Sequence, residues 1–149
     1  YISKIFNDDW MREHGFLEGP TAPLAEILAR KERLRGVIVA RADMSVREAV
    51  DLMREYDISQ MPVVDKGKVV GSVREDALIA KLLGSRTAAG RKVRAVMEKP
   101  FPIVAPGTPL ERIYRLLQRG SPAVLVGTET ALEGIVTRID VIEFLAARG

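Results

Sequence analysis

The feature that most constrains the fold of this chain is an internal repeat. One copy runs from about Gly36 to Gly84 and the other from about Pro102 to Arg148. Each copy places an apolar strand, an amphipathic helix, two strands joined by a turn and a second helix in the same order. A unit of about 60 residues is marginal when it folds alone. We therefore expect an α/β (α+β) fold in which two β-α-β-β-α repeats pack with pseudo-twofold symmetry.

The first copy carries recognisable signals for its helix and strand boundaries. We expect an apolar strand at 37–39, followed by a helix that Ser45 caps with Glu48 as its capping-box partner. Apolar residues recur at helical spacing and form the inner stripe of that helix: Val46, Ala49, Val50, Met53 and Tyr56. The elements expected after it are a strand at 61–65, a tight hairpin turn at 66–68, a strand at 69–73 and a helix at 75–83.

The second copy repeats this order with its own boundary signals. Thr108 is expected to cap its first helix, with Pro109 at the first helical position and Glu111 at the third. The inner stripe of that helix is Leu110, Ile113, Tyr114 and Leu117. The other expected elements are strands at 103–104 and 121–126, a turn at 127–133, a return strand at 134–136 and a closing helix at 137–148 with Val141, Phe144 and Leu145 inward.

The two copies differ in length at two places. Val46 matches Leu110 at a spacing of 64, Pro62 matches Pro122 at 60, and Gly71 matches Gly134 at 63. The second copy has therefore lost the four residues that align with Asp57-Ile-Ser-Gln60, and its hairpin is longer by three.

The repeat divides the chain into four segments. We expect 36–92 and 93–149 to be one domain each, and 18–35 to be a linker with Gly and Pro followed by a short amphipathic helix. The segment 1–17 holds four of the eight aromatic residues, and two short helices there cannot bury them alone. These helices either fold back onto the chain, pack against a second subunit, or are the C-terminal remnant of an upstream catalytic domain, which is the reading we adopt.

The composition excludes several classes of function. Cysteine is absent and His14 is the one histidine, which excludes disulfides, cysteine nucleophiles and Cys/His zinc sites. A net charge of +3 is too small to indicate nucleic acid as a partner. No apolar run is long enough for a membrane span and no secretory signal opens the chain, so we expect a cytoplasmic protein without a membrane partner. We assign no catalytic residue and no metal ligand.

The doubled motifs resemble the CBS domain, which occurs as tandem pairs called Bateman modules. In the first copy the motifs are Gln60–Asp65 (QMPVVD) and Val70–Val73 (VGSV). In the second copy they are Ser121–Val126 (SPAVLV) and Gly134–Asp140 (GIVTRID). Each motif alone is weak, but the doubled set in this order is specific, and it covers roughly residues 24–148.

Three stretches also resemble cystathionine β-synthase. Residues 1–17 look like the end of the pyridoxal-phosphate (PLP) domain of that enzyme, just before its regulatory CBS pair. The phrases at 54–64 (REYDISQMPVV) and 137–147 (TRIDVIEFLAA) look like the same branch. The resemblance implies a C-terminal regulatory region whose partner is its own catalytic domain. PLP would be bound only in that missing domain.

The resemblance to CBS pairs implies a site for an adenosyl small molecule. Their motif of Gly, two apolar residues, Ser or Thr and then Asp is matched by Gly134, Thr137 and Asp140, so Asp140 is expected to bind ribose hydroxyls and Thr137 a phosphate or carboxylate. Arg138 and Ile139 lie within that segment. The adenine end is expected to come from the other copy, through Gly36, Val37, Ile38, Ile58, Ser59, Gln60, Met61 and Pro62.

The first copy departs from the same motif. Arg74 occupies the Ser/Thr position and Ala77 the Asp position, while Asp76 lies one residue off, about 100° around the helix. The second copy also lacks the four residues that would face this site. We therefore predict one adenosyl site per chain.

The identity of the ligand and of the parent protein stays open at this point. S-adenosylmethionine is favoured by the resemblance to cystathionine β-synthase, whereas AMP or ATP would use arginines such as Arg138 and Arg74. The alternatives are an AMP/ATP sensor in another parent protein, or a structural dimerisation module with an empty site. A homodimer is the expected assembly.

Overall fold

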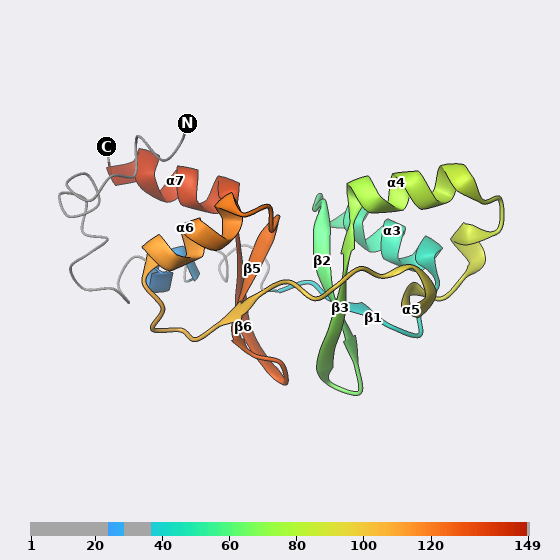
Figure 1. Ribbon diagram of the computed structural model, residues 1–149, viewed down its shortest axis with the longest axis horizontal. Coiled ribbons are helices and arrows are strands. Elements are labelled where there is room, and N and C mark those ends of the chain that lie inside the picture. Colours follow the sequence, from blue (N-terminus) through green and yellow to red (C-terminus); the bar gives the residue numbers. More distant parts are fainter. Residues whose placement is uncertain (1–23, 29–36, 149) are drawn as a thin grey trace. The chain divides into compact units, whose positions relative to one another are not determined.

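The computed structural model describes residues 24–28 and 37–148 (Figure 1). The expected helices at 1–17, residues 29–35 of the expected linker and helix, and the candidate site residue Gly36 lie outside the described residues. The rest forms two compact units. The first-repeat unit comprises 38–101, and the second-repeat unit comprises 102–148 together with 24–28 and Val37.

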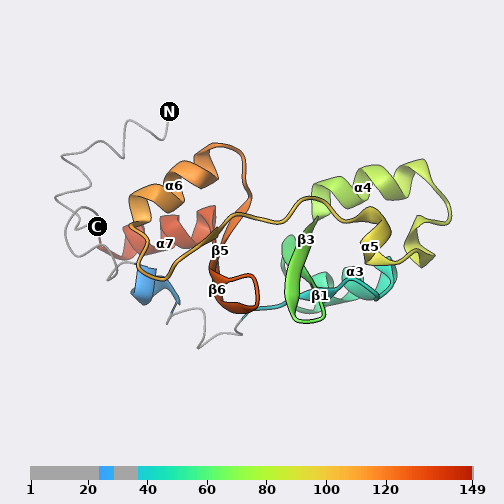
Figure 2. The same ribbon diagram turned by 60° about the horizontal axis from the view of Figure 1, so that its bottom comes forward.

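The first-repeat unit is a three-stranded sheet with the order β1-β2-β3, in which β1 is parallel and β3 antiparallel to β2. Helices α3 and α4 lie on the same side of this sheet (Figures 1 and 2). Their buried residues share one core cluster with β2 and β3, which includes Met53, Val63 and Leu78. The elements are β1 Ala40–Arg41, α3 Val46–Glu55, β2 Gln60–Asp65, β3 Lys68–Arg74, α4 Glu75–Gly84, the 3-10 turn η2 Ala88–Gly90 and α5 Val93–Val96.

The second-repeat unit has the same topology, with strand order β4-β5-β6 and the same mixture of parallel and antiparallel pairing. The stripe predicted for its first helix is buried as expected, and Val141 and Phe144 join it in one core cluster. Burial raises the pKa of the Tyr114 phenol in this core. The elements are β4 Ile103–Val104, α6 Leu110–Gln118, β5 Ala123–Thr128, β6 Ala131–Thr137 and α7 Arg138–Arg148. The α/β class with two repeats is therefore confirmed.

The short helical segment before each repeat packs into the core of the other repeat's unit. Leu24 and Ile27 precede the first repeat, yet both are buried in the core of the second-repeat unit. Val93 and Val96 of α5 precede the second repeat, yet both are buried in the core of the first-repeat unit. The chain therefore passes from one unit to the other twice, and the helical segment before each passage is buried in the unit that the chain leaves.

The first strand begins later than the apolar run predicts. The expected strand at 37–39 is wrong, because β1 is Ala40–Arg41 and pairs with Val63 and Val64 of β2. Burial alternates along 40–44, where Ala40, Ala42 and Met44 are buried and the polar residues between them are exposed. Two of the three buried residues in this alternating pattern are alanines, whose weak hydrophobicity makes the strand hard to recognise in the sequence.

Two expected boundaries in the second repeat are also wrong. Helix α6 begins at Leu110 with Pro109 as its N-cap, because the Pro109 carbonyl accepts the first helical N–H groups, and it has no side-chain cap from Thr108. The expected turn at 127–133 is largely strand, and only Glu129 and Thr130 separate β5 from β6. Gly127, at a φ of +125°, occupies a bulge in that ladder rather than the turn.

The turn predicted for the first repeat is confirmed. Lys66 and Gly67 alone connect β2 to β3, and both have positive φ, at +52° and +78°. Two positive φ values are typical of a type I′ hairpin turn, whose twist matches that of the flanking strands.

Candidate functional site

The segment where β6 passes into α7 forms a compact hydrogen-bonded turn. The backbone N–H of Thr137 donates to Asp140 Oδ2 at 2.8 Å, and the Thr137 hydroxyl donates to the same oxygen at 2.9 Å. An acid at the third helical position that accepts from the N-cap residue is half of a capping box. Asp140 is half-buried, and its carboxylate lies in the first turn of α7, where the helix dipole favours negative charge.

The two residues between Thr137 and Asp140 have different surroundings. Arg138 extends its guanidinium toward α6, where Nη2 donates to the Leu117 carbonyl at 2.6 Å. The Ile139 side chain is 56% exposed. No sequence pattern predicts the bond from Arg138 to Leu117, because the two residues lie 21 positions apart.

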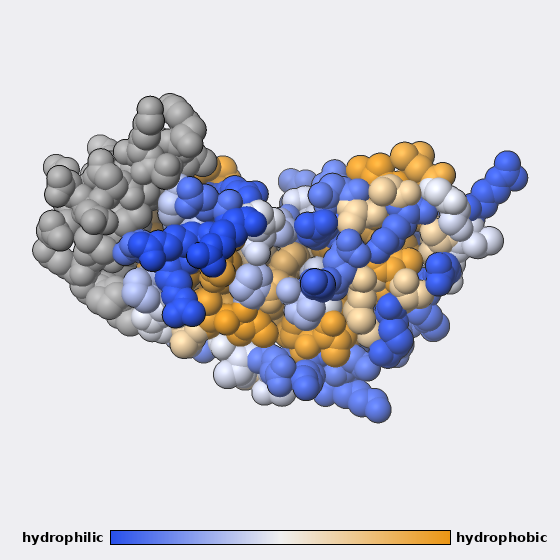
Figure 3. Space-filling model, in the orientation of Figure 1, coloured by the Kyte–Doolittle hydropathy of each residue, from blue (hydrophilic) through white to orange (hydrophobic). Residues whose placement is uncertain are grey.

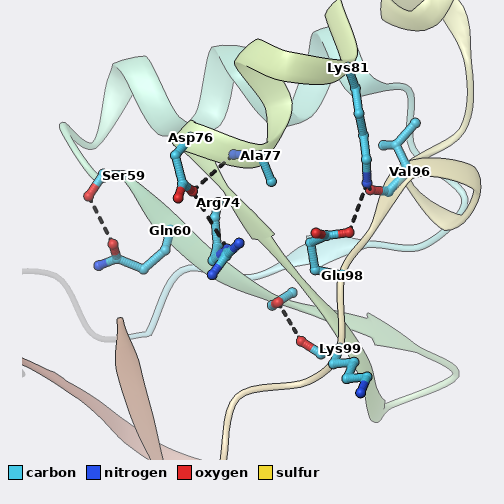
Figure 4. Close-up of polar contacts among 10 residues, drawn as sticks. Ser59, Gln60, Arg74, Asp76, Ala77, Lys81, Val96, Glu98 and Lys99 are labelled. Atoms are coloured by element: carbon cyan, nitrogen blue, oxygen red, sulfur yellow. Dashed lines mark hydrogen bonds and ion pairs between the residues drawn. The ribbon is translucent and has the colours of Figure 1, made fainter. Parts of the chain in front are cut away.

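The equivalent segment of the first repeat is built differently (Figure 4). Asp76 Oδ1 accepts the N–H of Ala77 at 2.9 Å and faces Arg74 Nε at 3.6 Å. Arg74 Nε is buried without a hydrogen-bond partner among the described residues. The Thr–Asp arrangement of the second repeat is therefore absent from this described segment, as the substitutions at Arg74 and Ala77 led us to expect.

The adenine-end candidates lie at the start of β2, next to the Arg74 segment. Gln60 pairs with Arg74 across β2 and β3, and the Glu75 N–H donates to the Ser59 carbonyl at 2.9 Å. The Ser59 hydroxyl donates to Gln60 Oε1 at 2.9 Å (Figure 4). These contacts place Ser59 and Gln60 beside the start of α4, within the first-repeat unit.

Two of the other adenine-end candidates, Met61 and Pro62, are more buried than Ser59 and Gln60. Met61 is fully buried in the core of its unit, so neither its side chain nor its backbone is exposed to a ligand. Pro62 is also buried, whereas Val37, Ile38 and Ile58 are half-buried. Thr137, Arg138, Ile139 and Asp140 belong to the second-repeat unit.

The glycine of each motif has a packing role that the sequence did not reveal. A Cβ on Gly134 would collide with the Leu28 side chain, which comes from the helical segment before the first repeat. A Cβ on Gly71 would lie 2.6 Å from Met97 Sδ and 2.9 Å from the Glu98 carbonyl oxygen. The absence of a side chain at Gly71 therefore lets residues 97–98 pack closely on β3, and its absence at Gly134 lets Leu28 pack closely on β6.

The described residues carry few other candidate features. Within 24–28 and 37–148 the acidic residues form no cluster of three or more that could hold a metal ion. The helices found in these ranges are too short or too polar to cross a membrane.

Two helices expose large apolar side chains. Ile79 and Leu83 on α4 are 52% and 83% exposed, and Ile142 on α7 is 54% exposed at the position equivalent to Ile79. Figure 3 shows apolar surface along α4. Repetition of this feature at equivalent positions indicates that it belongs to the repeat itself.

Comparison with known sequences finds one family twice. The family model described as the CBS domain matches residues 32–84 and 93–147. Cystathionine beta-synthase from Oryctolagus cuniculus is 25% identical over 167 aligned positions, which cover all of this chain and 30% of that enzyme. The chain thus spans about a third of the length of the cystathionine β-synthases it matches.

Comparison with solved structures finds the same architecture. A CBS-domain containing protein from Agrobacterium tumefaciens superposes with a TM-score of 0.72 at 23% identity, covering 82% of this chain and 92% of that one. At this identity the likeness concerns the fold alone. CBSX2, a CBS-pair protein of Arabidopsis thaliana, was solved in complex with AMP; it has a TM-score of 0.64 at 27% identity and covers 76% of this chain and 90% of its own.

Proposed function

This chain belongs to the CBS domain family, and we propose that its two repeats form a regulatory module that binds one adenosyl ligand and reports it to a catalytic domain. The observation that carries the proposal is the Thr137–Asp140 turn. Its carboxylate is held in a fixed orientation by two hydrogen bonds and is only half-buried. A carboxylate that is fixed in this way accepts hydrogen bonds from ribose hydroxyls without first having to be ordered.

The proposed site follows the family pattern residue by residue. Asp140 accepts from the ribose. The Thr137 hydroxyl turns from Asp140 to donate to the phosphate or carboxylate end of the ligand, while the Thr137 N–H keeps its bond to the Asp140 carboxylate. The N-terminal end of α7 favours a negative group at this place. Apolar walls and backbone groups suit an adenine ring, whose edge needs one donor and one acceptor. The further residues of the proposed site are Gly36, Val37, Ile38, Ile58, Ser59, Gln60, Met61, Pro62, Arg138 and Ile139.

Two adenosyl ligands have support from different relatives. S-adenosylmethionine is favoured by the match of the whole chain to cystathionine β-synthase, and in that case the parent protein is a PLP-dependent lyase whose PLP is bound in its catalytic domain. AMP or ATP is equally supported, because CBSX2 was solved with AMP. Either ligand needs only about 1–3 kcal/mol of coupling between its site and the catalytic domain to act as a regulator.

A second candidate function is self-association without a ligand. Ile79 of α4 and Ile142 of α7 are exposed at equivalent positions of the two repeats, which suits an isologous contact with a second copy. A homodimer is compatible with ligand binding as well. The two functions are therefore separated by binding measurements rather than by the oligomeric state.

Calorimetric titration with S-adenosylmethionine, AMP and ATP tests the proposal. We expect one of these ligands to bind, and we expect Asp140→Ala to weaken its binding about tenfold or more, because each lost charge-assisted hydrogen bond costs roughly 1.5–3 kcal/mol. The control is Asp51→Ala, which removes an exposed acid from α3 and should leave the affinity unchanged.

The outcomes separate the candidates. Heat from AMP or ATP alone supports a nucleotide sensor, and the absence of heat with all three ligands supports a purely structural module. If both alanine variants weakened binding equally, the assignment of the site to the Thr137–Asp140 turn would be wrong.

A further inference from the structure

Arg138 joins the end of one helix to the beginning of another. It is the first residue of α7, and its Nη2 donates to the carbonyl of Leu117 in the last turn of α6 at 2.6 Å. The Leu117 side chain is only 2% exposed, so its carbonyl is fixed by the core of the unit. A guanidinium at the C-terminal end of a helix is also favoured by the helix dipole.

The first repeat satisfies the equivalent carbonyl in another way. Leu117 matches Met53 at the same spacing as Leu110 matches Val46. The Met53 carbonyl accepts the backbone N–H of Ile58 at 3.0 Å. Ile58 is one of the four residues that the second copy lacks. In the second repeat the Leu117 carbonyl accepts the Gly120 N–H at 3.3 Å, which is longer than the bond in the first repeat. It also accepts the shorter bond of 2.6 Å from Arg138 Nη2.

The Arg138 side chain that provides this bond belongs to the same helix start as the proposed ligand-binding turn. Arg138 directly follows Thr137, and Asp140 lies two residues later in the same first turn of α7. Anchoring Arg138 to α6 therefore fixes the start of α7, on which the orientation of the Asp140 carboxylate depends. The bond to Leu117 uses one of the five guanidinium N–H donors and restrains where the group lies.

We propose that Arg138 is a positioning residue for the Thr137–Asp140 turn, which replaces the backbone donor lost with the shorter connection of the second repeat, and that it does not bind the ligand's phosphate. The expected effect of Arg138 on ligand affinity rests on the proposed function. The expected effect of Arg138 on the geometry of the turn rests on the structure alone. The affinity of every adenosyl ligand should depend on Arg138 to the same degree, whether or not the ligand carries a phosphate.

The test compares Arg138→Gln and Arg138→Lys with the intact chain in titrations with adenosine, AMP and S-adenosylmethionine. We expect Arg138→Gln to weaken each ligand that binds the intact chain by the same factor, about tenfold, and to leave the ratio of AMP to adenosine affinity unchanged. Arg138→Lys keeps a positively charged donor, so its loss of affinity should be smaller than that of Arg138→Gln. The control is Arg112→Gln, at an exposed position of α6, which should change neither affinity nor ratio.

Amide hydrogen exchange without ligand supplies a second readout. The Thr137 N–H donates to Asp140 and should exchange faster in Arg138→Gln than in the intact chain or in Arg112→Gln. This measurement tests the positioning role even if no ligand binds, in which case the proposed function fails by itself. If Arg138→Gln does not fold, the smaller change in Arg138→Lys carries both comparisons.

Three outcomes would overturn the inference. Weakening of AMP with unchanged adenosine affinity would make Arg138 a phosphate ligand. A lower melting temperature with unchanged affinities and unchanged exchange at Thr137 would make it a structural residue only. Unchanged exchange, affinity and stability together would leave it without a role.

Discussion

Single side chains decide how the helices of this protein begin. Ser45 Oγ accepts the N–H of Glu48 at 3.1 Å and so satisfies one of the unpaired donors at the start of α3. Helix α6 has no such cap, because Pro109 occupies the N-cap position. At α7 the acid of the first turn accepts from the preceding threonine instead, and this third solution gives the Thr137–Asp140 turn its shape.

Replacing the caps of α3 and α6 should therefore have unequal effects. We expect Ser45→Ala to lower the free energy of unfolding of the first-repeat unit by about 1 kcal/mol, the typical value of a side-chain cap. Thr108→Ala is the matched change before α6 and should stay within about 0.5 kcal/mol of the intact chain. Urea denaturation followed by circular dichroism measures both, and equal losses would contradict the assignment of the two helix starts.

At the residue scale the sequence predicted what depends on local spacing. Ser45 was predicted as a cap, and Lys66 and Gly67 were predicted as a turn, because both patterns involve neighbours in sequence. The bond from Arg138 to Leu117 was not predicted, since long-range side-chain contacts leave no periodic trace. The proposed roles of Thr137 and Asp140 came from a family pattern and stay predictions until ligand binding is measured.

Among the elements, the segment that leaves α5 is held along β3. The backbone groups of Ser72 and Glu98 exchange two hydrogen bonds at 3.0 and 2.8 Å, and the Ser72 hydroxyl donates to the Lys99 carbonyl at 2.5 Å. Lys81 of α4 binds Glu98 Oε2 at 2.9 Å and also the Val96 carbonyl (Figure 4). The crossing segment is therefore fixed to both the sheet and the second helix of the first repeat.

Gly71 permits this arrangement, which makes it sensitive to a single methyl group. In Gly71→Ala the new Cβ would lie 2.9 Å from the backbone oxygen of Glu98, so the crossing segment must shift. We expect a loss of about 1–3 kcal/mol in unfolding free energy, as for overpacking elsewhere.

The control for this change is Gly84→Ala at the end of α4. A Cβ on Gly84 meets no atom within 4 Å, so this variant should be neutral or slightly stabilising. Thermal unfolding of the two variants provides the measurement. A stable Gly71→Ala protein would show that the segment 97–99 does not pack on β3.

The elements that were predicted best are those with a strong amphipathic period. The whole inner stripe predicted for α6 is buried, because apolar residues at helical spacing bury one face of the helix. Three of the five residues predicted for α3 are buried, whereas Val50 is half-buried and Tyr56 is the half-buried C-cap. Strand β1 was placed too early, because Ala40 and Ala42 carry little apolar signal although both are buried. The hairpin of the second repeat was drawn with too long a turn, since a bulge at Gly127 looks like a turn in sequence.

At the scale of the whole molecule, the two repeats exchange the segments that precede them. Residues 24–28 precede the first repeat but belong to the second-repeat unit, whereas α5 precedes the second repeat but belongs to the first-repeat unit. A domain joined upstream of residue 24 would thus connect to the unit that carries Thr137 and Asp140.

The same exchange explains why sequence and structure divide the chain differently. A repeat in the sequence groups residues by order, so α5 was assigned to the copy that follows it. Burial groups residues by packing, and Val93 and Val96 are buried with the copy that precedes them. No local pattern distinguishes the two possibilities, because either core offers an apolar surface to the short helix.

The binding stoichiometry of the intact chain tests the central claim most directly. Titration with the adenosyl ligand that binds, followed by calorimetry at concentrations well above its dissociation constant, should give one equivalent per chain, because only the second repeat has the Thr137–Asp140 turn. Two equivalents per chain would show that the Arg74–Ala77 segment also forms a site, and no binding of S-adenosylmethionine, AMP or ATP would contradict the proposed function itself.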